Sequence, residues 1–484
     1  MSDKAVSRIE VDVAVIGAGT AGMNAYRAAR EHTDRIVLIE RGPYGTTCAR
    51  VGCMPSKLLI AAAEVAATIR RAAPFGVHAG EPTIDGPGVM RRVRHERDRF
   101  VGFVVNAVEA WPEPQRLRGT ARFVDRNTLM VDQHTEVRAQ RVVIATGTRP
   151  KKPADWVAAL GDRLLVNDDV FEWQDLPRSL AVIGAGVIGV ELAQALAALG
   201  VRVRLLGRRS RLLHLTDPEV AACARNLLHA HLPYVEDAQH LQFRQSADAI
   251  SLSWMQGGAP VHEEFELVLC AIGREPNLDS LDFDAIDPPR DADGRLSVDR
   301  DTCQLGDSSI FIAGDVHGLT PILHEAADDG RIAGDNAGRW PDLRAHPRRV
   351  RLNIAFSEPQ AVIVGDGYAG LQQRDIDFAC GSVDWSDQGR ARVMMRNAGL
   401  LRVYGDRASG CFLGAEMLGP NAEHIGHLLA WVLQQGLSVE QMLAMPFYHP
   451  VLEEGLRTAL RDLLRELRMG PAPVKRALDC GPGA

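Results

Sequence analysis

Long apolar runs and an export signal are both missing from this sequence. Its most apolar stretches, such as LLIAAAEVAATI at residues 58–69, fall short of the roughly 20 residues that cross a membrane as a helix. The N-terminal MSDKAVSRIE lacks the basic segment followed by an apolar segment that marks a signal peptide. We therefore expect a cytoplasmic protein that makes no membrane contact.

A basic excess is missing too. The chain carries 55 Lys and Arg against 62 Asp and Glu, a net charge of −7, and so has no electrostatic footprint for nucleic acid. Most cysteines are scattered, which excludes a secreted disulfide framework. The scattered ones are Cys223, Cys270, Cys303, Cys380, Cys411 and Cys480. Only Cys48 and Cys53 lie close together in the sequence.

What the chain does have is length and an ordinary globular composition. Its 484 residues are too many for one core, so roughly two to four domains are expected. Apolar residues make up 46% and charged residues 24%, which is average for folded proteins.

A dinucleotide-binding fingerprint stands near the N-terminus. Residues 11–22, VDVAVIGAGTAG, are a β-branched run that ends in Gly17, Gly19 and Gly22 and passes into an Ala-rich helical pattern. A second strand, RIVLIE, ends in Glu40. Strand, glycine turn, helix, strand and acid follow in the order of a Rossmann-like unit, with the acid roughly 20 residues beyond the glycines.

The same pattern returns at residues 179–209, with Gly184, Gly186 and Gly189 after another apolar strand. The two units also end alike. RVVIATGTRP and ELVLCAIGREP are each an apolar strand that closes on a small-x-Gly turn, at Gly147 and Gly273. Two such units predict two dinucleotides bound side by side.

The rest of the chain changes in texture. SIFIAGDV, residues 309–316, is an apolar strand that ends in Gly314-Asp315 and precedes a helical pattern. Beyond about residue 350, strand-like runs are followed by two helical stretches. The runs lie at 361–365, 391–396, 400–405 and 411–418, and the helical stretches at 422–436 and 452–468.

Cys48 and Cys53 belong to the stretch GTTCARVGCMPSK. No second Cys/His pair with zinc-ligand spacing follows nearby, and a buried structural role would not explain the neighbouring residues. In a regular helix, residues five apart rise about 7.5 Å, so a disulfide needs a distorted turn, which Gly52 can supply. Pro55 suits the first turn of a helix whose N-terminus would favour a Cys53 thiolate.

In combination, these motifs resemble the class I pyridine nucleotide-disulfide oxidoreductases, and most of all the dihydrolipoyl dehydrogenases among them. TTCARVGCMPSK is similar to the family's GGTC-x-x-x-GC-x-PSK element, and GAGVIGVELA, ATG, GREPN and AGDV follow in family order. The resemblance extends from about Val11 to Leu467. It implies an α/β fold with two Rossmann-like dinucleotide-binding domains and an α+β C-terminal dimerisation domain.

The resemblance also implies domain boundaries and site residues. The FAD-binding domain would comprise 1–155 and 277–348, the NAD(P)-binding domain 156–276, the dimerisation domain 349–469, and a disordered tail 470–484. Cys48 would be the interchange thiol and Cys53 the charge-transfer thiol, with Lys57 paired to Glu191 near the flavin. The residues implied to bind FAD are Gly17, Gly19, Gly22, Glu40, Lys57, Gly147 and Asp315, and those implied to bind NAD(P) include Gly184, Gly186, Gly189 and Gly273.

Thiol-disulfide exchange near neutral pH needs a base, and histidine is the natural candidate. The stretch MPFYHPVLEEGLR contains the family's HP-x-x-x-E pattern, which selects His449 among fifteen histidines. Spacing assigns its partner carboxylate to Glu454, with Glu453 as a rival. In the resembling family the base acts on the disulfide of the opposite subunit, so we expect an obligate homodimer.

The second unit favours NADP(H). NAD-specific family members place a carboxylate where Gly207 stands, whereas arginines accommodate a 2′-phosphate. Here the acid is absent, and Arg208, Arg209 and Arg211 follow. An exposed basic turn without a ligand is the alternative interpretation.

The sequence motifs indicate the substrate less directly than the nucleotide. A dihydrolipoyl dehydrogenase-like exchange with a dithiol or disulfide is expected. An NADPH-dependent, glutathione reductase-like reductase of another disulfide is the alternative. A non-catalytic flavin-binding sensor or structural subunit is a third. Mercuric reductases and large thioredoxin reductases need two redox groups in the tail, where only Cys480 stands. Soluble transhydrogenases lack the redox cysteines.

Overall fold

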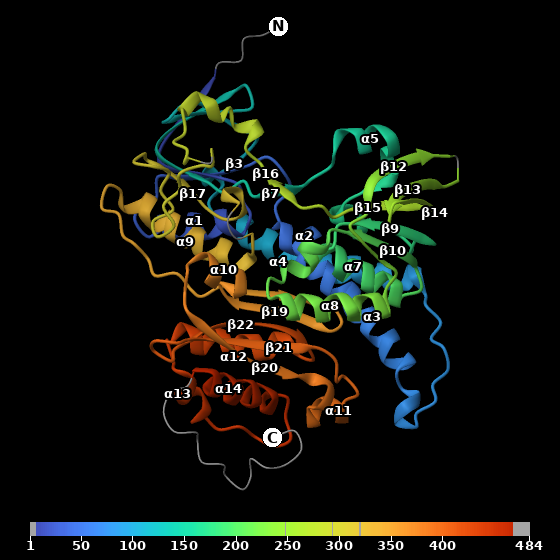
Figure 1. Cartoon of the computed structure of the whole chain (residues 1–484). Coiled ribbons are helices and arrows are strands. Elements are labelled where there is room, and N and C mark those ends of the chain that lie inside the picture. The colour runs from blue at the N-terminus through green and yellow to red at the C-terminus, as the bar shows by residue number, and fades with distance from the viewer. Residues whose placement is uncertain (1–5, 247, 293, 319–320, 468–484) are drawn as a thin grey trace.

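The structure is a computed structural model that describes residues 6–246, 248–292, 294–318 and 321–467, without the side chains of residues 209–211. It consists of three domains, of which the third, coloured orange to red, lies below the other two in Figure 1. The predicted disordered tail, 470–484, lies outside the described residues.

The first domain is built on a sheet of seven strands in the order β3-β2-β1-β6-β5-β4, with β17 paired to β6. Val13 and Val15 of β1 are fully buried, because parallel neighbours and helices cover this strand on all sides. The strands are β1 Ser7–Ile16, β2 Ile36–Glu40, β3 Arg116–Arg118, β4 Ala121–Asp125, β5 Thr128–Val131, β6 Thr135–Ile144 and β17 Ile310–Ile312. The helices are α1 Thr20–Arg30, α2 Thr47–Val51, α3 Cys53–Arg70, α4 Gly86–Glu109 and α9 Leu323–Arg339.

Helices α1 and α9 lie unusually close together, although about three hundred residues separate them in the sequence. A Cβ on Gly330 would stand 2.1 Å from the Ala21 carbonyl oxygen, and one on Gly334 would stand 2.2 Å from the Ala25 carbonyl oxygen. Only glycine permits this approach. The segment after Asp315 therefore packs against the first domain.

The second domain has five parallel strands in the order β11-β10-β9-β15-β8, with an antiparallel sheet β12-β13-β14 beside them. Two short strands, β7 Thr148–Pro150 and β16 Arg274–Pro276, pair where the chain enters and leaves it. The other strands are β8 Leu164–Leu165, β9 Ser179–Ile183, β10 Arg202–Gly207, β11 Tyr234–Glu236, β12 Gln239–Gln245, β13 Ile250–Gln256, β14 Ala259–Phe265 and β15 Leu267–Cys270. The helices are α5 Ala154–Leu160, α6 Asn167–Val170, α7 Val187–Ala198 and α8 Pro218–His231.

The third domain is an antiparallel sheet in the order β18-β19-β22-β21-β20, covered by helices. Its strands are β18 Leu352–Ala355, β19 Gln360–Gly365, β20 Phe378–Asp384, β21 Leu400–Asp406 and β22 Phe412–Gly419. Its helices are α10 Gly367–Gln373, α11 Gly389–Val393, α12 Ala422–Gln434, α13 Val439–Leu443 and α14 Glu453–Leu467.

One predicted strand of this domain is wrong. Residues 391–396 were expected to be extended, but they form the end of α11 and a turn. The Gln388 side chain caps the helix by accepting the Ala391 amide at 2.7 Å, and Met395 follows at a φ of +52°. A local cap thus overrides the apolar pattern of this short run.

Two fully buried carboxylates join the second domain to the third. Asp217 caps α8 and also accepts the Tyr404 hydroxyl of β21 at 3.0 Å. Glu416 of β22 accepts the Thr216 and Asp217 amides at 2.8 and 3.0 Å, together with the Tyr368 amide. Because each of these buried acceptors takes hydrogen bonds across the boundary, they fix the two domains relative to each other.

Helix α3 runs between the domains. By length and composition alone, Thr47–Arg70 is the one helical stretch of the described residues that is apolar enough to cross a membrane. Only uninterrupted apolar runs were considered in the sequence, so this stretch was not selected there. In the structure, Leu59 and Ile60 belong to a core that also contains Met90 of α4 and Leu192 of α7. One face of α3 therefore packs into the interior of the protein.

Candidate functional site

The two neighbouring cysteines lie on either side of a break between helices. Thr46 caps α2 by accepting the Ala49 amide at 3.2 Å, and α2 ends at Gly52. Gly52 has φ −127° and ψ −117°, and α3 starts at Cys53. A Cβ on Gly52 would stand 3.0 Å from the Thr47 carbonyl oxygen and 3.1 Å from the Cys48 Cα. The expected distortion at Gly52 is present, and it places the two thiols close enough to influence each other's acidity.

The hydrogen bond between the thiols is the largest influence on the acidity of both. It lowers the pKa of Cys53 to about 7, with help from the Lys57 charge and against the effects of burial and of Glu191. It raises the pKa of Cys48, and burial raises it further. As the pH rises through neutrality, the reduced pair therefore forms its thiolate on Cys53, while Cys48 stays a thiol.

Lys57 follows Cys53 by one turn of α3, and the expected pair with Glu191 is present. Lys57 Nζ donates to Glu191 Oε2 at 2.7 Å, and Glu191 is 4% exposed. The other carboxylate oxygen accepts the Phe356 amide at 2.8 Å, and Lys57 Nζ lies 4.5 Å from the centre of the Phe356 ring. Phe356 of the third domain thus contacts both members of the pair. Sequence analysis missed it, because no spacing signal links it to the cysteines.

We expect opposite pH shifts from the two members of this pair. In the reduced enzyme, thiolate absorbance in the ultraviolet should titrate with a midpoint of about pH 7 and disappear in Cys53→Ser. Lys57→Met removes a favourable charge and should move the midpoint upward. Glu191→Gln removes an unfavourable one and should move it downward. Lys57→Arg retains the charge and is the control, and equal midpoints in all variants would contradict this electrostatic account.

The first glycine loop lies where β1 passes into α1. Gly17 has a φ of +105°, and a Cβ there would stand 2.4 Å from the Ala145 carbonyl oxygen, while a Cβ on Gly22 would stand 1.8 Å from the Gly17 carbonyl oxygen. Gly19 faces open space and begins the helix. Its position leaves the first amides of α1 accessible to a phosphate. Glu40 accepts the Ala18 amide at 2.7 Å, which holds the expected ribose-binding acid against this loop.

The predicted flavin-side residues meet at the ends of β6 and β17, which pair in parallel. Gly147 has a φ of +64° and faces open space. Asp315 accepts the Thr148 hydroxyl at 3.3 Å, and burial raises its pKa against the opposing charge of Arg274. The buried Thr146 hydroxyl has no hydrogen-bond partner among the described residues. A polar ligand here would form hydrogen bonds with the Thr146 hydroxyl and the Asp315 carboxylate. This turn and the first glycine loop therefore fit FAD.

The second glycine loop repeats the first. Gly184 has a φ of +120°, and a Cβ there would stand 2.2 Å from the Ala271 carbonyl oxygen. A Cβ on Gly189 would stand 1.8 Å from the Gly184 carbonyl oxygen, and Gly186 begins α7. Gly273 has a φ of +118° and faces open space. The loop therefore fits a second dinucleotide.

The turn after β10 is the predicted nucleotide-selecting segment. A Cβ on Gly207 would stand 2.4 Å from the Ala185 Cβ, so a side chain does not fit there without a shift of the loop. Arg208 is exposed, whereas the side chains of Arg209 and Arg211 lie outside what the structure describes. His214, which sequence analysis did not select, places Nε2 3.5 Å from the position of a Cβ on Gly186.

His449 and the Glu454 carboxylate form a separate group at the start of α14. His449 Nδ1 lies 3.0 and 3.1 Å from the two oxygens of Glu454, which is 4% exposed. The Val451 amide and Arg457 also donate to that carboxylate, at 3.2 and 3.4 Å. Glu454 rather than Glu453 therefore orients the imidazole, whose side chain is 76% exposed.

Within one chain the histidine and the cysteines stay apart. In Figure 1, α2 lies in the middle of the molecule, and the connection between α13 and α14 lies at its lower end. A site that uses both groups therefore requires a second subunit.

Comparisons with known proteins agree with this arrangement. Residues 11–330 match a family described as pyridine nucleotide-disulphide oxidoreductase, and residues 353–460 match the dimerisation domain of that family. The latter match supports a homodimer.

Two curated relatives and one solved structure extend over most of the chain. A dihydrolipoyl dehydrogenase of Geobacillus stearothermophilus is 27% identical over 457 residues, 92% of this chain and 94% of its own. Dihydrolipoyl dehydrogenase 2 of Haloarcula marismortui is 30% identical over 465 residues, 93% and 95% of the two chains. The crystal structure of LpdA from Mycobacterium tuberculosis has a TM-score of 0.78 at 21% identity and covers 94% and 99%.

Proposed function

Because this chain belongs to the pyridine nucleotide-disulphide oxidoreductase family, we propose that it exchanges electrons between a nicotinamide nucleotide and a dithiol or disulfide through Cys48 and Cys53. The family depends on FAD and NAD(P), and the chain is a flavoprotein oxidoreductase similar to dihydrolipoyl dehydrogenases. One observation carries the assignment of the residues. The break at Gly52 unites the two thiols, and the Lys57–Glu191 pair stands one turn away.

The first glycine loop, Glu40 and the Asp315 turn would hold FAD, which would supply two-electron transfer between the nicotinamide and the disulfide. The chain's own groups carry the subsequent proton and sulfur chemistry. Cys48 is held as a thiol, so it needs a base before it can attack, and His449 of the partner subunit is the proposed base. Glu454 fixes the imidazole through Nδ1, which leaves Nε2 to take the proton from Cys48.

Exchange then proceeds in two displacements. The Cys48 thiolate attacks one sulfur of the substrate, the substrate S–S bond breaks, and the leaving thiolate takes the proton from His449. The Cys53 thiolate next attacks the Cys48 sulfur, which restores the Cys48–Cys53 disulfide and releases the second substrate sulfur as a thiolate that takes up a proton from solvent. In sum, NAD(P)H, a proton and a disulfide give NAD(P)⁺ and two thiols, and the same steps run backwards with a dithiol substrate.

NADP(H) is the proposed nucleotide. The closed position at Gly207 supports this choice, since a ribose-binding acid there would collide with Ala185. Exposed Arg208 follows immediately and is available to a 2′-phosphate. Arg209 and Arg211 support the proposal by sequence alone.

Arg208→Ala should lower kcat/KM for NADPH by about 10- to 100-fold and leave that for NADH nearly unchanged, because a hydrogen bond to a charged group contributes about 1.5–3 kcal/mol. Steady-state kinetics with both nucleotides measures this. Arg202→Ala is the matched control, since Arg202 begins the same strand and pairs with Glu263. A parallel loss for both nucleotides, or no loss at all, would count against a 2′-phosphate contact at Arg208.

The substrate is proposed to be a lipoyl group or another small disulfide, taken up by a homodimer. The test is oxidation of dihydrolipoamide by the purified protein with NAD⁺ and NADP⁺ in parallel, and reduction of lipoamide and glutathione disulfide by NADPH. Turnover with dihydrolipoamide supports the dihydrolipoyl dehydrogenase-like function. Turnover confined to NADPH and another disulfide supports the glutathione reductase-like alternative, and FAD binding without any thiol turnover would contradict both. A cytoplasmic location remains a prediction from the sequence.

A further inference from the structure

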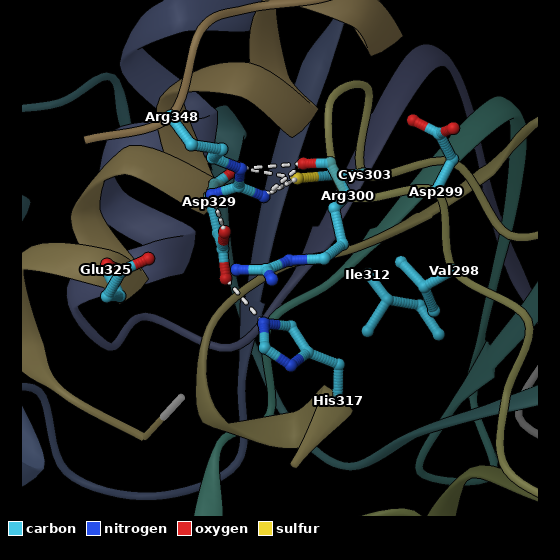
Figure 2. A pocket seen from close by; sticks show the side chains of 9 residues that line it. All are labelled: Val298, Asp299, Arg300, Cys303, Ile312, His317, Glu325, Asp329 and Arg348. Atoms are coloured by element: carbon cyan, nitrogen blue, oxygen red, sulfur yellow. Dashed lines mark hydrogen bonds and ion pairs between the residues drawn. The ribbon is translucent and has the colours of Figure 1, made fainter. Parts of the chain in front are cut away.

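A buried polar cluster stands behind the turn that carries Asp315. We call it the Asp329 cluster, and Figure 2 shows most of its members. It consists of the side chains of Asp329, His317, Arg348 and Cys303 and the backbone amide of Gly314. These groups come from α9, from the turn after β17, from the loop before β17 and from the segment that leads into the third domain.

Asp329 is the centre of this cluster and is only 1% exposed. Its Oδ2 accepts the Gly314 amide at 3.0 Å and lies 2.7 Å from His317 Nε2. Its Oδ1 accepts from the Arg348 guanidinium. Two carboxylate oxygens thus receive three donors, and the neutral amide of asparagine, with one acceptor oxygen, could not satisfy all of them.

Two residues that donate to Asp329 lie on either side of Asp315 in the sequence. Gly314 precedes Asp315, and His317 ends the same short helical turn. Gly314 has a φ of +79°, and a Cβ there would stand 2.8 Å from the Ala21 Cβ of α1. The turn is therefore held by Asp329 at both ends while it lies against the helix that follows the first glycine loop.

The helix that carries Asp329 is itself fixed. Gly330, the next residue, seats the α9 backbone on Ala21 of α1, so α9 has little freedom to shift. Arg348 Nε donates to the Arg300 carbonyl oxygen at 2.7 Å, which anchors the guanidinium independently of Asp329. The cluster thus ties the Asp315 turn to α9, which packs against α1, the helix that follows the first glycine loop.

We propose that Asp329 is a positioning residue for FAD, because it accepts hydrogen bonds from Gly314 and His317 and thereby fixes the turn that presents Asp315 to the cofactor. This inference rests on the proposed placement of FAD beside Asp315 and is independent of which disulfide is reduced. The charge state agrees with it. Burial raises the pKa of Asp329, but the hydrogen bond and charge of His317 and the charge of Arg348 outweigh burial and hold it below the ordinary value.

The test measures FAD affinity in the holoenzyme rather than turnover. Serial dilution of the purified holoenzyme, with released FAD followed by its fluorescence, gives a dissociation constant for each variant. Asp329→Asn should raise that constant at least about tenfold, since a buried donor is left without an acceptor. Asp328→Asn is the matched control, because that neighbouring carboxylate pairs with Arg349 and not with the turn, and it should stay close to wild type.

A second pair of variants keeps the test valid if Asp329→Asn does not fold. His317→Leu removes the donor and should weaken FAD binding, whereas His317→Gln retains an Nε2 donor and should restore most of it. Equal FAD affinity in Asp329→Asn and wild type, or an equal loss in His317→Leu and His317→Gln, would overturn the proposal. A wild-type protein that binds no FAD would instead contradict the proposed function.

Discussion

Replacement of Cys48 by serine should abolish exchange with disulfides, by at least about three orders of magnitude, while NADPH still bleaches the flavin absorbance. A serine hydroxyl cannot form the mixed disulfide, and its pKa lies far above that of a thiol. The nucleotide side does not need Cys48, because the second glycine loop and the Lys57–Glu191 pair remain intact. Stopped-flow reduction of the flavin and steady-state disulfide turnover separate the two halves.

Cys53→Ser serves as the partner variant in this experiment. It leaves the Cys48 thiol in place but removes the thiolate that resolves the mixed disulfide, so we expect a covalent adduct with the substrate that mass spectrometry detects. Cys223→Ser, on α8, is the control for cysteine loss and should behave as wild type. If Cys48→Ser retained disulfide turnover, Cys48 would not be the interchange thiol.

Replacement of His449 by glutamine should lower the rate of thiol-disulfide exchange by about 10²- to 10⁴-fold at neutral pH. The reason lies in the thiols. The pKa of Cys48 is raised while that of Cys53 is lowered. The attacking sulfur, that of Cys48, is therefore the one whose thiolate form is not stabilised within its own chain. Raising the pH should partly restore the rate of His449→Gln, since hydroxide then replaces the base.

The adjacent glutamates provide a matched pair for this prediction. Glu454→Gln should also slow exchange, because the amide cannot stabilise the imidazolium as the carboxylate does. Glu453→Gln should leave the rate within about twofold, because Glu454 supplies the carboxylate that contacts the imidazole. If Glu453→Gln were the slower of the two variants, Glu453 would be the carboxylate that orients the imidazole. An unchanged rate in His449→Gln would exclude His449 as the base.

Local sequence signals predicted much of this site. Gly17 and Gly184 must adopt positive φ beside a neighbouring strand end, which only glycine does easily, so their spacing reports the loop directly. Gly52 was predicted to distort the turn between the cysteines, and a side chain there would crowd Thr47 and Cys48.

Long-range contacts left no such signal. Phe356 and Asp329 act on groups far away in the sequence, and neither stands in a spacing that a single sequence distinguishes from an ordinary core aromatic or a solvated acid. The strand predicted at 391–396 failed for a local reason, the Gln388 cap. The prediction for the tail and that for the side chains of Arg209 and Arg211 lie outside the described residues.

The measurement that tests the central claim most directly is an anaerobic titration of the oxidised holoenzyme with NADPH, followed by counting of its accessible thiols. If Cys48 and Cys53 form a disulfide that exchanges electrons with the flavin, wild type should consume two equivalents of NADPH per flavin and gain two thiols. Cys48→Ser should consume one equivalent and gain none. A wild-type protein that stops at one equivalent with no new thiols would contradict the account.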